Sequence, residues 1–376
     1  MQFKNSVFVL GPYKKSYKKK HDGQDYQLND AYFCTIVCTY LISFVFGVWS
    51  IGGWLKSNYI FTESDLGYVR LTFSSWDWTT RNRSSSVLGK LIIEKEILEY
   101  LEEEKSKSDR QKAHKTHKLI RRRILLVITS VIVISFNCAA VYISKFWIPY
   151  GSYGVAGVVW LVTELCSLIF GGIAKYEKYP KHVELLLAVL RNVFTYCASL
   201  YVLVIYDMVK QRNYCCWEDE IGDQMYSLLV ACIGSEVTFA LSTTLQRVKA
   251  KNVEQYPEPK IVKQATHVIK LQAISWIGIL WAPLIPLVTL VALFVVIVAN
   301  CINIFALKLK PKEVFRVSRA KFLFLVVVQV SLWLDIAISF YILFFKDPSN
   351  NCTPYRNDPT PFRSTSIYKL MTPNIR

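Results

Sequence analysis

Two carboxylates lie inside long apolar stretches of this sequence, where a charged group needs a partner or water. Glu164 follows Thr163 and has Trp160 and Leu161 close by. Ionised side chains are costly within a membrane, so they mark ion pathways or paired sites. A carboxylate at this position, with the hydroxyl of Thr163 beside it, indicates a route for cations.

Glu236 lies halfway along another apolar stretch, which also carries many hydroxyl side chains. These are Ser235, Thr238, Ser242, Thr243 and Thr244. On a helix they give one polar side that could line an aqueous groove. Alternatively, such small residues allow close packing and hydrogen bonds between helices. Both interpretations stay open, but two acidic residues on different helices favour a pore.

Further polar residues lie in the neighbouring apolar stretches. Gln272 and Asn300 are candidates to line the same route. Lys270 lies near one end of its stretch, and Arg191 is close enough to a helix end for its charge to reach water. Asp335 lies in the middle of the last stretch and is interpreted as either paired or protonated.

The sequence contains no enzyme motif beside these residues. A phosphate-binding glycine loop, a nucleophile elbow and an HExxH sequence are all missing. Seven of the ten cysteines lie in apolar stretches, where cysteine acts as a small hydrophobic residue, and there is no CxxC pair. We therefore expect no enzymatic activity, no metal site and no cofactor.

Transmembrane helices are the elements that must position these residues. The chain is 52% hydrophobic, yet it carries 45 Lys and Arg against 28 Asp and Glu, so apolar and basic residues are segregated. Each crossing needs roughly 20 apolar residues. The predicted fold is an all-α, polytopic membrane protein of about eight transmembrane helices, at 31–55, 124–144, 154–174, 186–209, 225–246, 268–286, 287–307 and 322–345. The net charge of +17 comes without a nucleic-acid-binding motif, so nucleic acid is not an expected partner.

Charge on the connecting segments predicts the orientation. With these spans, 29 Lys and Arg fall in the connecting segments on one side, and the internal loops on the other side hold 3. The positive-inside rule then places the first side in the cytoplasm and both chain ends outside. Five lysines before the first span oppose this placement, and they suggest an earlier helix upstream. They are Lys14, Lys15, Lys18, Lys19 and Lys20.

The predicted organisation therefore has five parts. They are an extracellular segment 1–30, a transmembrane helix 31–55, a cytoplasmic loop 56–123, a seven-helix membrane core with the pore region 124–345, and an extracellular segment 346–376. Asn351 begins an Asn-Cys-Thr sequon and is a glycosylation candidate on the outside. Cys352 shares that side with Cys215 and Cys216, and a disulfide from Cys352 to one of the two is possible.

The cytoplasmic loop contains an amphipathic helix. Its apolar side includes Leu88, Leu91, Ile92, Leu98 and Leu101, set among glutamates. A helix of this kind either lies on the inner membrane surface or binds a partner in a groove. The glutamates argue somewhat against anionic lipid.

Three motifs resemble the transmembrane channel-like family. Residues 216–222, with Cys216, Trp217, Glu218 and Gly222, are similar to its Cys-Trp-Glu-Thr-x-Val-Gly signature. Trp276 and Gly278, followed by Trp281, Ala282 and Pro283, resemble its Trp-Met-Gly and Tyr-Ala-Pro. Residues 314–319, with Ser318 and Arg319, resemble its Val-Phe-Lys-Ala-Ser-Arg. Weaker matches in the first half extend the resemblance over most of the chain.

The resemblance implies a fold and a function. The fold is related to the anoctamin and hyperosmolality-gated channels, in a dimer whose subunits each hold a pore between the helices that correspond to spans three to seven. Glu164 falls where the family commonly has a pore-lining methionine, and Thr244 where hair-cell members have an acidic pore residue. The resemblance also implies that 56–123 binds a calcium- and integrin-binding EF-hand protein. The family core has one helix before residue 31 and one after residue 345, so we expect this sequence to be part of a longer chain.

The leading hypothesis is a mechanosensitive cation channel subunit of the plasma membrane, in contact with membrane lipids. Bilayer tension would favour a wider groove between spans three and seven, where acidic side chains concentrate permeant cations. One alternative is a lipid scramblase of the same fold. Another is a non-conducting subunit that acts as a scaffold for an EF-hand partner.

Overall fold

The structure is a computed structural model of the 376-residue chain. The residues that it describes are 8–9, 13, 16–18, 25–59, scattered positions from 73 to 142, 151–177, 181–210, 216–249, 261–305, 317–349, 352–355, 360–363 and 365.

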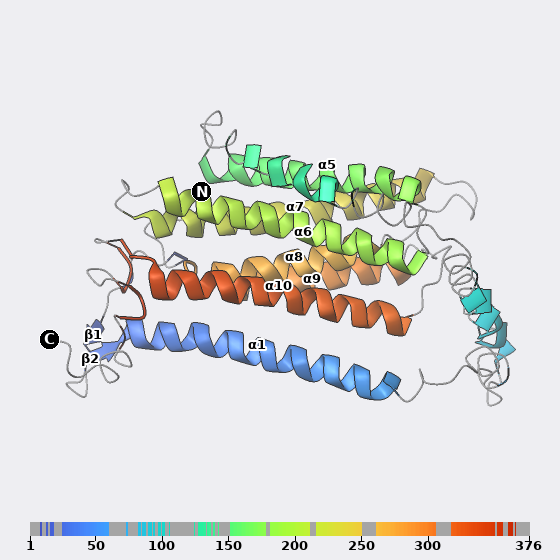
Figure 1. Cartoon of the computed structure of the whole chain (residues 1–376), viewed down its shortest axis with the longest axis horizontal. Helices are drawn as coiled ribbons and strands as arrows, with labels where there is room; N and C mark the ends of the chain where they lie inside the picture. Colours follow the sequence, from blue (N-terminus) through green and yellow to red (C-terminus); the bar gives the residue numbers. More distant parts are fainter. Residues whose placement is uncertain are drawn as a thin grey trace.

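Seven long helices of the described part lie side by side as an elongated bundle (Figure 1). They are α1 (Leu28–Tyr59), α5 (Gly151–Glu177), α6 (Lys181–Lys210), α7 (Trp217–Lys249), α8 (Ile261–Gly278), α9 (Ile285–Phe305) and α10 (Val317–Phe345). At the left in Figure 1, α1 begins and α10 ends. We call this the disulfide end of the bundle, because Cys216 and Cys352 are joined there. The end of the bundle at the right in Figure 1 is called the opposite end.

Six of these helices are long and apolar enough to cross a membrane, namely α1, α5, α6, α7, α9 and α10. The prediction of an all-helical, polytopic membrane protein is therefore confirmed. The expected number of eight spans differs from these six for two reasons. α8 carries Lys263, His267 and Lys270 and is not among the six. The predicted span 124–144 is described only in part, as a shorter apolar helix at Val127–Phe136.

The outward faces of the bundle are apolar, as a lipid environment requires. On α1, Phe46 and Trp49 are 64% and 72% exposed. On α9, Leu290 and Phe294 are 65% and 66% exposed. The interior is filled by a large apolar cluster to which α1, α5, α6, α7, α8, α9 and α10 contribute.

The turn between α8 and α9 is fixed by its proline and by hydroxyl groups from α1. Pro283 has no N–H, so the carbonyl of Ile279, four residues earlier, lacks its helical donor. The Tyr32 hydroxyl donates to that carbonyl. The Tyr40 hydroxyl likewise donates to the carbonyl of Trp276, at 2.7 Å. Two tyrosines of α1 therefore satisfy carbonyls that the end of α8 leaves open.

Close contacts join α1 to α10. A Cβ at Gly47 would lie only 2.0 Å from Oε1 of Gln329, so the glycine leaves room for the Gln329 side chain between the two helices. Trp54 stacks on Phe322 with ring centroids 4.2 Å apart. The hydroxyls of Tyr40 and Ser339 share a hydrogen bond of 2.6 Å in the interior.

Some elements differ from the sequence prediction. The polar segment before residue 31 contains a small antiparallel hairpin of β1 (Ser16–Lys18) and β2 (Asp25–Gln27), in which Tyr17 pairs with Tyr26. α7 begins at Trp217 rather than near 225, because its first turn carries three acidic residues that suit a helix N-terminus. α8 ends at Gly278 rather than at 286, since the turn precedes the prolines.

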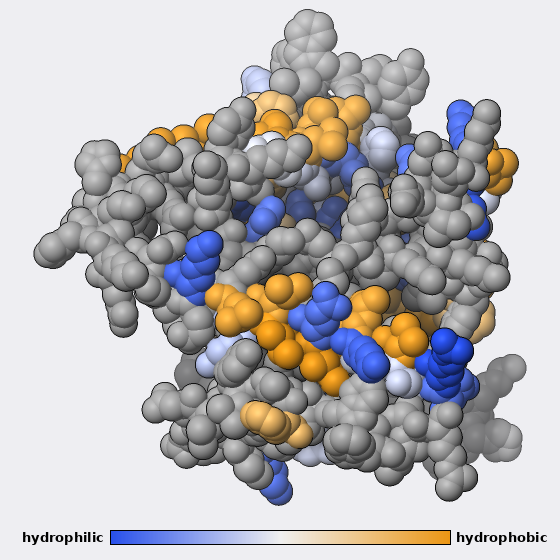
Figure 2. All heavy atoms as spheres, turned by 90° about the vertical axis from the view of Figure 1, so that its right-hand side faces the viewer, coloured by the Kyte–Doolittle hydropathy of each residue, from blue (hydrophilic) through white to orange (hydrophobic). Residues whose placement is uncertain are grey.

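The described positions between 82 and 105 lie at the opposite end of the bundle, drawn in cyan in Figure 1. Figure 2 faces this end and shows apolar side chains next to hydrophilic ones. Leu91, Leu98 and Leu101 are 44%, 47% and 48% exposed. Leu88 and Ile92, the other residues of the predicted partner-binding side, lie outside the described side chains.

Candidate ion pathway

An ion pair joins α5 to α8. The Lys263 ammonium donates to Oε2 of Glu164 at 3.0 Å, and the side chains are 35% and 30% exposed. Both groups therefore lie at an edge of the bundle where protein covers them only in part. Glu164 does not face a pore as a free carboxylate here, because Lys263 cancels its charge.

A second acid–base pair lies deeper, between α7 and α8. Oε2 of Glu236 is 3.9 Å from Nε2 of His267, and the two side chains are 3% and 6% exposed. The other oxygen, Oε1 of Glu236, is buried without a hydrogen-bond partner. His267 follows Lys263 by four residues, so the two pairs are one helical turn apart along α8.

One face of α8 supplies the basic partners. Lys263, His267 and Lys270 are spaced by four and three residues, which places them on the same helix face. Lys263 lies over the ring of Phe239 on α7, 5.1 Å from its centroid. Lys270 lies over the ring of Tyr196 on α6, at 5.3 Å. Cation–π contacts of this kind hold the two ammonium groups toward α7 and α6. We call Glu164, Glu236, Lys263, His267 and Lys270 the charged face.

The hydroxyl residues of α7 do not form one polar side. Glu236 and Thr243 are buried, whereas Thr238 and Ser242 are exposed. Ser235, Thr238, Ser242 and Thr244 each donate to a carbonyl three or four residues earlier on α7, at 2.7 to 2.9 Å. Thr163 does the same on α5, with the carbonyl of Trp160. These hydroxyls are therefore satisfied within their own helices, as in apolar surroundings.

The remaining candidates are spread over other helices. Gln272 is half-buried on α8, close in sequence to Lys270. Asn300 is half-buried on α9, and its Oδ1 is buried without a hydrogen-bond partner. Among the described residues, neither amide makes a hydrogen bond or ion pair with the charged face.

Lys263 and His267 were missed by the sequence analysis. They fall in 247–267, which was predicted as a cytoplasmic loop because hydropathy drops there. Their spacing of four residues, continued by Lys270 three residues later, was the available signal. This spacing places three basic groups on one helix face, where they can neutralise carboxylates on the neighbouring helices.

Asp335 lies elsewhere in the interior. It is fully buried on α10, and its Oδ1 accepts a hydrogen bond of 2.8 Å from the Tyr201 hydroxyl on α6. Its Oδ2 has no hydrogen-bond partner. Ser331 and Ser339, four residues to either side, are also buried. The Tyr201 hydroxyl is thus the hydrogen-bond partner of Asp335, which is compatible with both interpretations of this residue.

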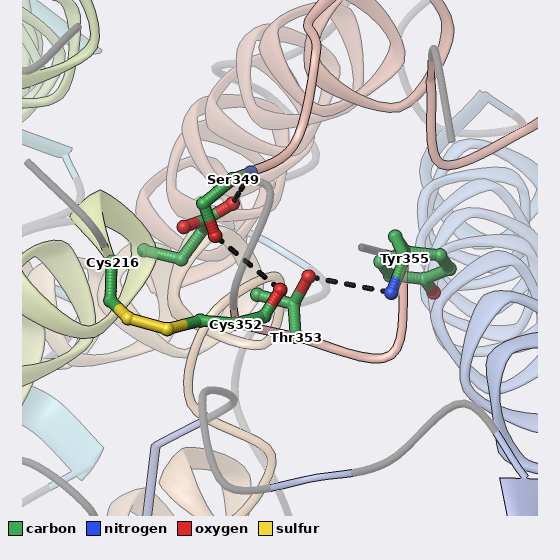
Figure 3. The surroundings of a disulfide bond; sticks show 6 residues. Cys216, Ser349, Cys352, Thr353 and Tyr355 are labelled. Carbon is green, nitrogen blue, oxygen red and sulfur yellow. Dashed lines mark hydrogen bonds between the residues drawn. A yellow bond between two sulfur atoms is a disulfide. The ribbon is translucent and has the colours of Figure 1, made fainter. Parts of the chain in front are cut away.

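A disulfide closes one end of the bundle. Cys216, at the start of α7, is joined to Cys352, beyond the end of α10, with their Cα atoms 5.6 Å apart (Figure 3). Of the two possible partners of Cys352, the structure uses Cys216. Asn351, the predicted glycosylation residue, lies outside the described residues. Within the described part, no group of three or more His, Cys, Asp or Glu is placed to hold a metal ion.

Hydrogen bonds around the disulfide tie α7 to the chain after α10. Oε1 of Glu218 accepts from the backbone N–H of Ser349 at 2.7 Å, and the Tyr355 N–H donates to Oγ1 of Thr353 at 3.3 Å (Figure 3). Lys346 donates to the carbonyl of Met208 at 3.0 Å. Burial raises the pKa of the Tyr355 hydroxyl, which keeps it protonated.

Two signature motifs pack directly on each other at this end. A Cβ at Gly222 would lie 3.3 Å from the carbonyl oxygen of Trp281, so the glycine brings α7 close to the α8–α9 turn. A Cβ at Gly278 would lie 2.7 Å from Cδ1 of Ile285 across the same turn. Trp217, Trp276 and Trp281 are buried. Ser318 and Arg319 belong to the first turn of α10, and their side chains lie outside the described set.

Comparisons with known proteins agree with this architecture. Residues 216–318 match the TMC domain, which includes α7, α8, α9 and four of the five residues of the charged face. The chain is 23% identical to transmembrane channel-like protein 5 of Rattus norvegicus, over 95% of this chain and 39% of that protein. It is 23% identical to transmembrane channel-like protein 6 of Mus musculus, over 91% of this chain and 45% of that protein.

A third relative carries a functional name. The chain is 25% identical to the voltage-gated chloride channel TMC4 of Mus musculus, over 50% of this chain and 31% of that protein. The chain thus spans less than half the length of these curated relatives. Relatives of this family are channel-like membrane proteins rather than enzymes. With its long apolar helices and its match to the TMC domain over residues 216–318, the chain is similar to the transmembrane channel-like proteins.

Proposed function

We propose that this chain is a mechanosensitive ion channel subunit in which cations pass between α5, α6, α7, α8 and α9. The supporting observation is the charged face, which places Glu164 and Glu236 on two membrane-spanning helices that pack together. Membrane helices rarely carry such groups unless they serve transport or a buried pair. The partly exposed pair at Glu164 marks the side from which water and ions enter.

Tension provides the gating stimulus in this proposal. A stretched bilayer favours the protein state with the larger cross-section. Separating α5 from α8 would widen the bundle and expose both carboxylates to water. The cation preference then depends on Glu164, which is the more accessible of the two.

Pressure-clamp recording from liposomes that hold the 376-residue chain tests this function. We expect stretch-evoked current, and we expect Glu164→Gln to lower the permeability of cations relative to chloride, because one fixed negative charge is lost. Glu184→Gln is the matched control, since Glu184 is an exposed carboxylate on α6 that does not belong to the charged face. Complete absence of stretch-evoked current would contradict the proposal. Equal permeability ratios in all three proteins would exclude Glu164 from the pathway.

Anion passage is the second candidate function. Lys263 and Lys270 lie on the charged face, and one relative is named a voltage-gated chloride channel. A reversal potential that follows the chloride gradient in the same recordings would favour this function.

The other expectations remain proposals of the same kind. One is that the chain forms a homodimer in the plasma membrane. Another is that an EF-hand protein binds the segment that includes the exposed Leu91, Leu98 and Leu101. Transfer of fluorescent lipids between leaflets without ion current would favour the scramblase. Co-purification with the EF-hand protein in the absence of current would favour the scaffold.

A further inference from the structure

We propose that Lys263 is the countercharge that holds the α5–α8 edge closed and neutral at rest, so that its separation from Glu164 opens the route and makes it cation-selective. This inference rests on the proposed function and deepens it. It assigns to Lys263 both the resistance of the closed state to tension and the ion selectivity of the open state.

The position of Lys263 supports this role. Its ammonium group contacts Glu164 on α5 and the ring of Phe239 on α7, while its own backbone belongs to α8. Helix packing among the described residues brings α5 against α6 and α7, and α8 against α6, α7, α9 and α10. The Glu164–Lys263 pair therefore joins α5 to α8, two helices that both pack against α6 and α7.

Exposure distinguishes this pair from the deeper one. The Glu164 and Lys263 side chains are 30% and 35% exposed, whereas Glu236 and His267 are 3% and 6% exposed. Protein encloses the outer pair less completely, so fewer contacts resist its separation. A modest force on the helices would thus part the outer pair first, while the direct packing of α7 on α8 persists.

Separation of the outer pair changes the charge of the route. While the pair is intact, the two charges cancel, and an ion at this edge meets little net field. Once it parts, the Phe239 ring still attracts Lys263 toward α7. Glu164 is then left as an unpaired carboxylate on α5, at the place where cations enter. Opening and cation selectivity follow from the same movement.

Four variants test the role of the pair in the reconstituted chain. Lys263→Gln and Glu164→Gln each remove the attraction, so each should shift the closed–open balance at fixed pressure by about two-fold toward the open state, the size expected for a partly exposed ion pair. Lys263→Gln should also raise cation preference, whereas Glu164→Gln should lower it. The exchange Glu164→Lys with Lys263→Glu restores attraction and should keep the wild-type pressure response. Lys321→Gln, an exposed lysine on α10, controls for loss of one positive charge.

Cross-linking supplies a test that does not depend on current. With Glu164→Cys and Lys263→Cys in one chain, a short thiol cross-linker should join α5 to α8 in resting vesicles and much less in osmotically swollen ones. Equal cross-linking in both conditions, or none at rest, would overturn the inference. The inference would also be overturned if both single Gln variants gave stretch-evoked current with the pressure response of the wild type. That result would not contradict the proposed function. Absence of current in the wild type would instead refute the proposed function.

Discussion

Single polar groups inside the bundle lie beside polar groups of other helices. Glu164 is paired with Lys263 and Asp335 accepts a hydrogen bond from Tyr201, whereas Glu236 lies 3.9 Å from His267 without a hydrogen bond. Because an unpaired charge in a membrane costs several kcal/mol, these contacts explain how charged side chains persist in apolar helices. They also mean that a carboxylate in a transmembrane stretch does not reveal by itself the charge that an ion meets.

The sequence predicted the acidic half of the charged face but not the basic half. Glu164 and Glu236 stand out because their neighbours are apolar. Lys263 and His267 follow a polar segment, where hydropathy gives no sign that a helix of the bundle has begun. The hydropathy pattern of one stretch shows whether a charged residue is unusual among its sequence neighbours. The partner on another helix depends on packing that the local pattern does not contain.

The Tyr40 hydroxyl offers a residue-scale test of the α1–α8 contact. We expect Tyr40→Phe to destabilise the protein by about 1–3 kcal/mol, because the carbonyl of Trp276 would be left buried without a donor. The measurement is thermal unfolding of the purified protein in detergent. Tyr341→Phe is the control, since Tyr341 is 56% exposed on α10. Equal melting temperatures for the two variants would show that the Tyr40 hydrogen bond does not hold α1.

At the scale of elements, turns and helix ends depend on particular residues rather than on hydropathy. Pro283 and Pro286 lie where α8 turns into α9, close to the boundary between the predicted spans 268–286 and 287–307. The turn begins earlier than expected, at Gly278, since the backbone folds back before the first proline. Hydropathy also placed the start of α7 too late, because it detects the membrane portion of a helix and not its polar first turns.

Gly278 gives an element-scale test of this turn. Gly278→Ala would place a Cβ 2.7 Å from Cδ1 of Ile285, whose side chain is fully buried. We expect a loss of about 1–3 kcal/mol, as in other overpacked interiors. Adding Ile285→Val removes that Cδ1 and should recover part of the loss.

Gly234 is the matched control for this prediction, since a Cβ there meets no atom within 4 Å. Gly234→Ala should leave thermal unfolding unchanged or slightly raise the melting temperature, because alanine favours helix. A similar loss for both glycine variants would indicate a general effect of the substitution and would refute the contact with Ile285.

At the scale of the whole molecule, composition was sufficient for the fold class. Segregated apolar and basic residues predicted a polytopic helical protein, and six described helices have the required length and apolar character. The small β1–β2 hairpin was not predicted, because its three-residue strands lie in a lysine-rich segment without an alternating apolar pattern. The similarity to transmembrane channel-like proteins rests on the TMC domain match and on the relatives. In the proposed function, the ion that passes and the stimulus that opens the route depend on the charged face.

The most direct measurement is modification of a single thiol during stretch-evoked current. In liposomes that hold Glu164→Cys in a background without exposed thiols, a positively charged methanethiosulfonate reagent should reduce cation current, because it places a fixed positive charge on the route. The same reagent should leave Leu290→Cys unchanged, since Leu290 is 65% exposed on the apolar surface of α9. Current at Glu164→Cys that ignores the reagent, or an equal reduction at Leu290→Cys, would contradict a pathway along the charged face.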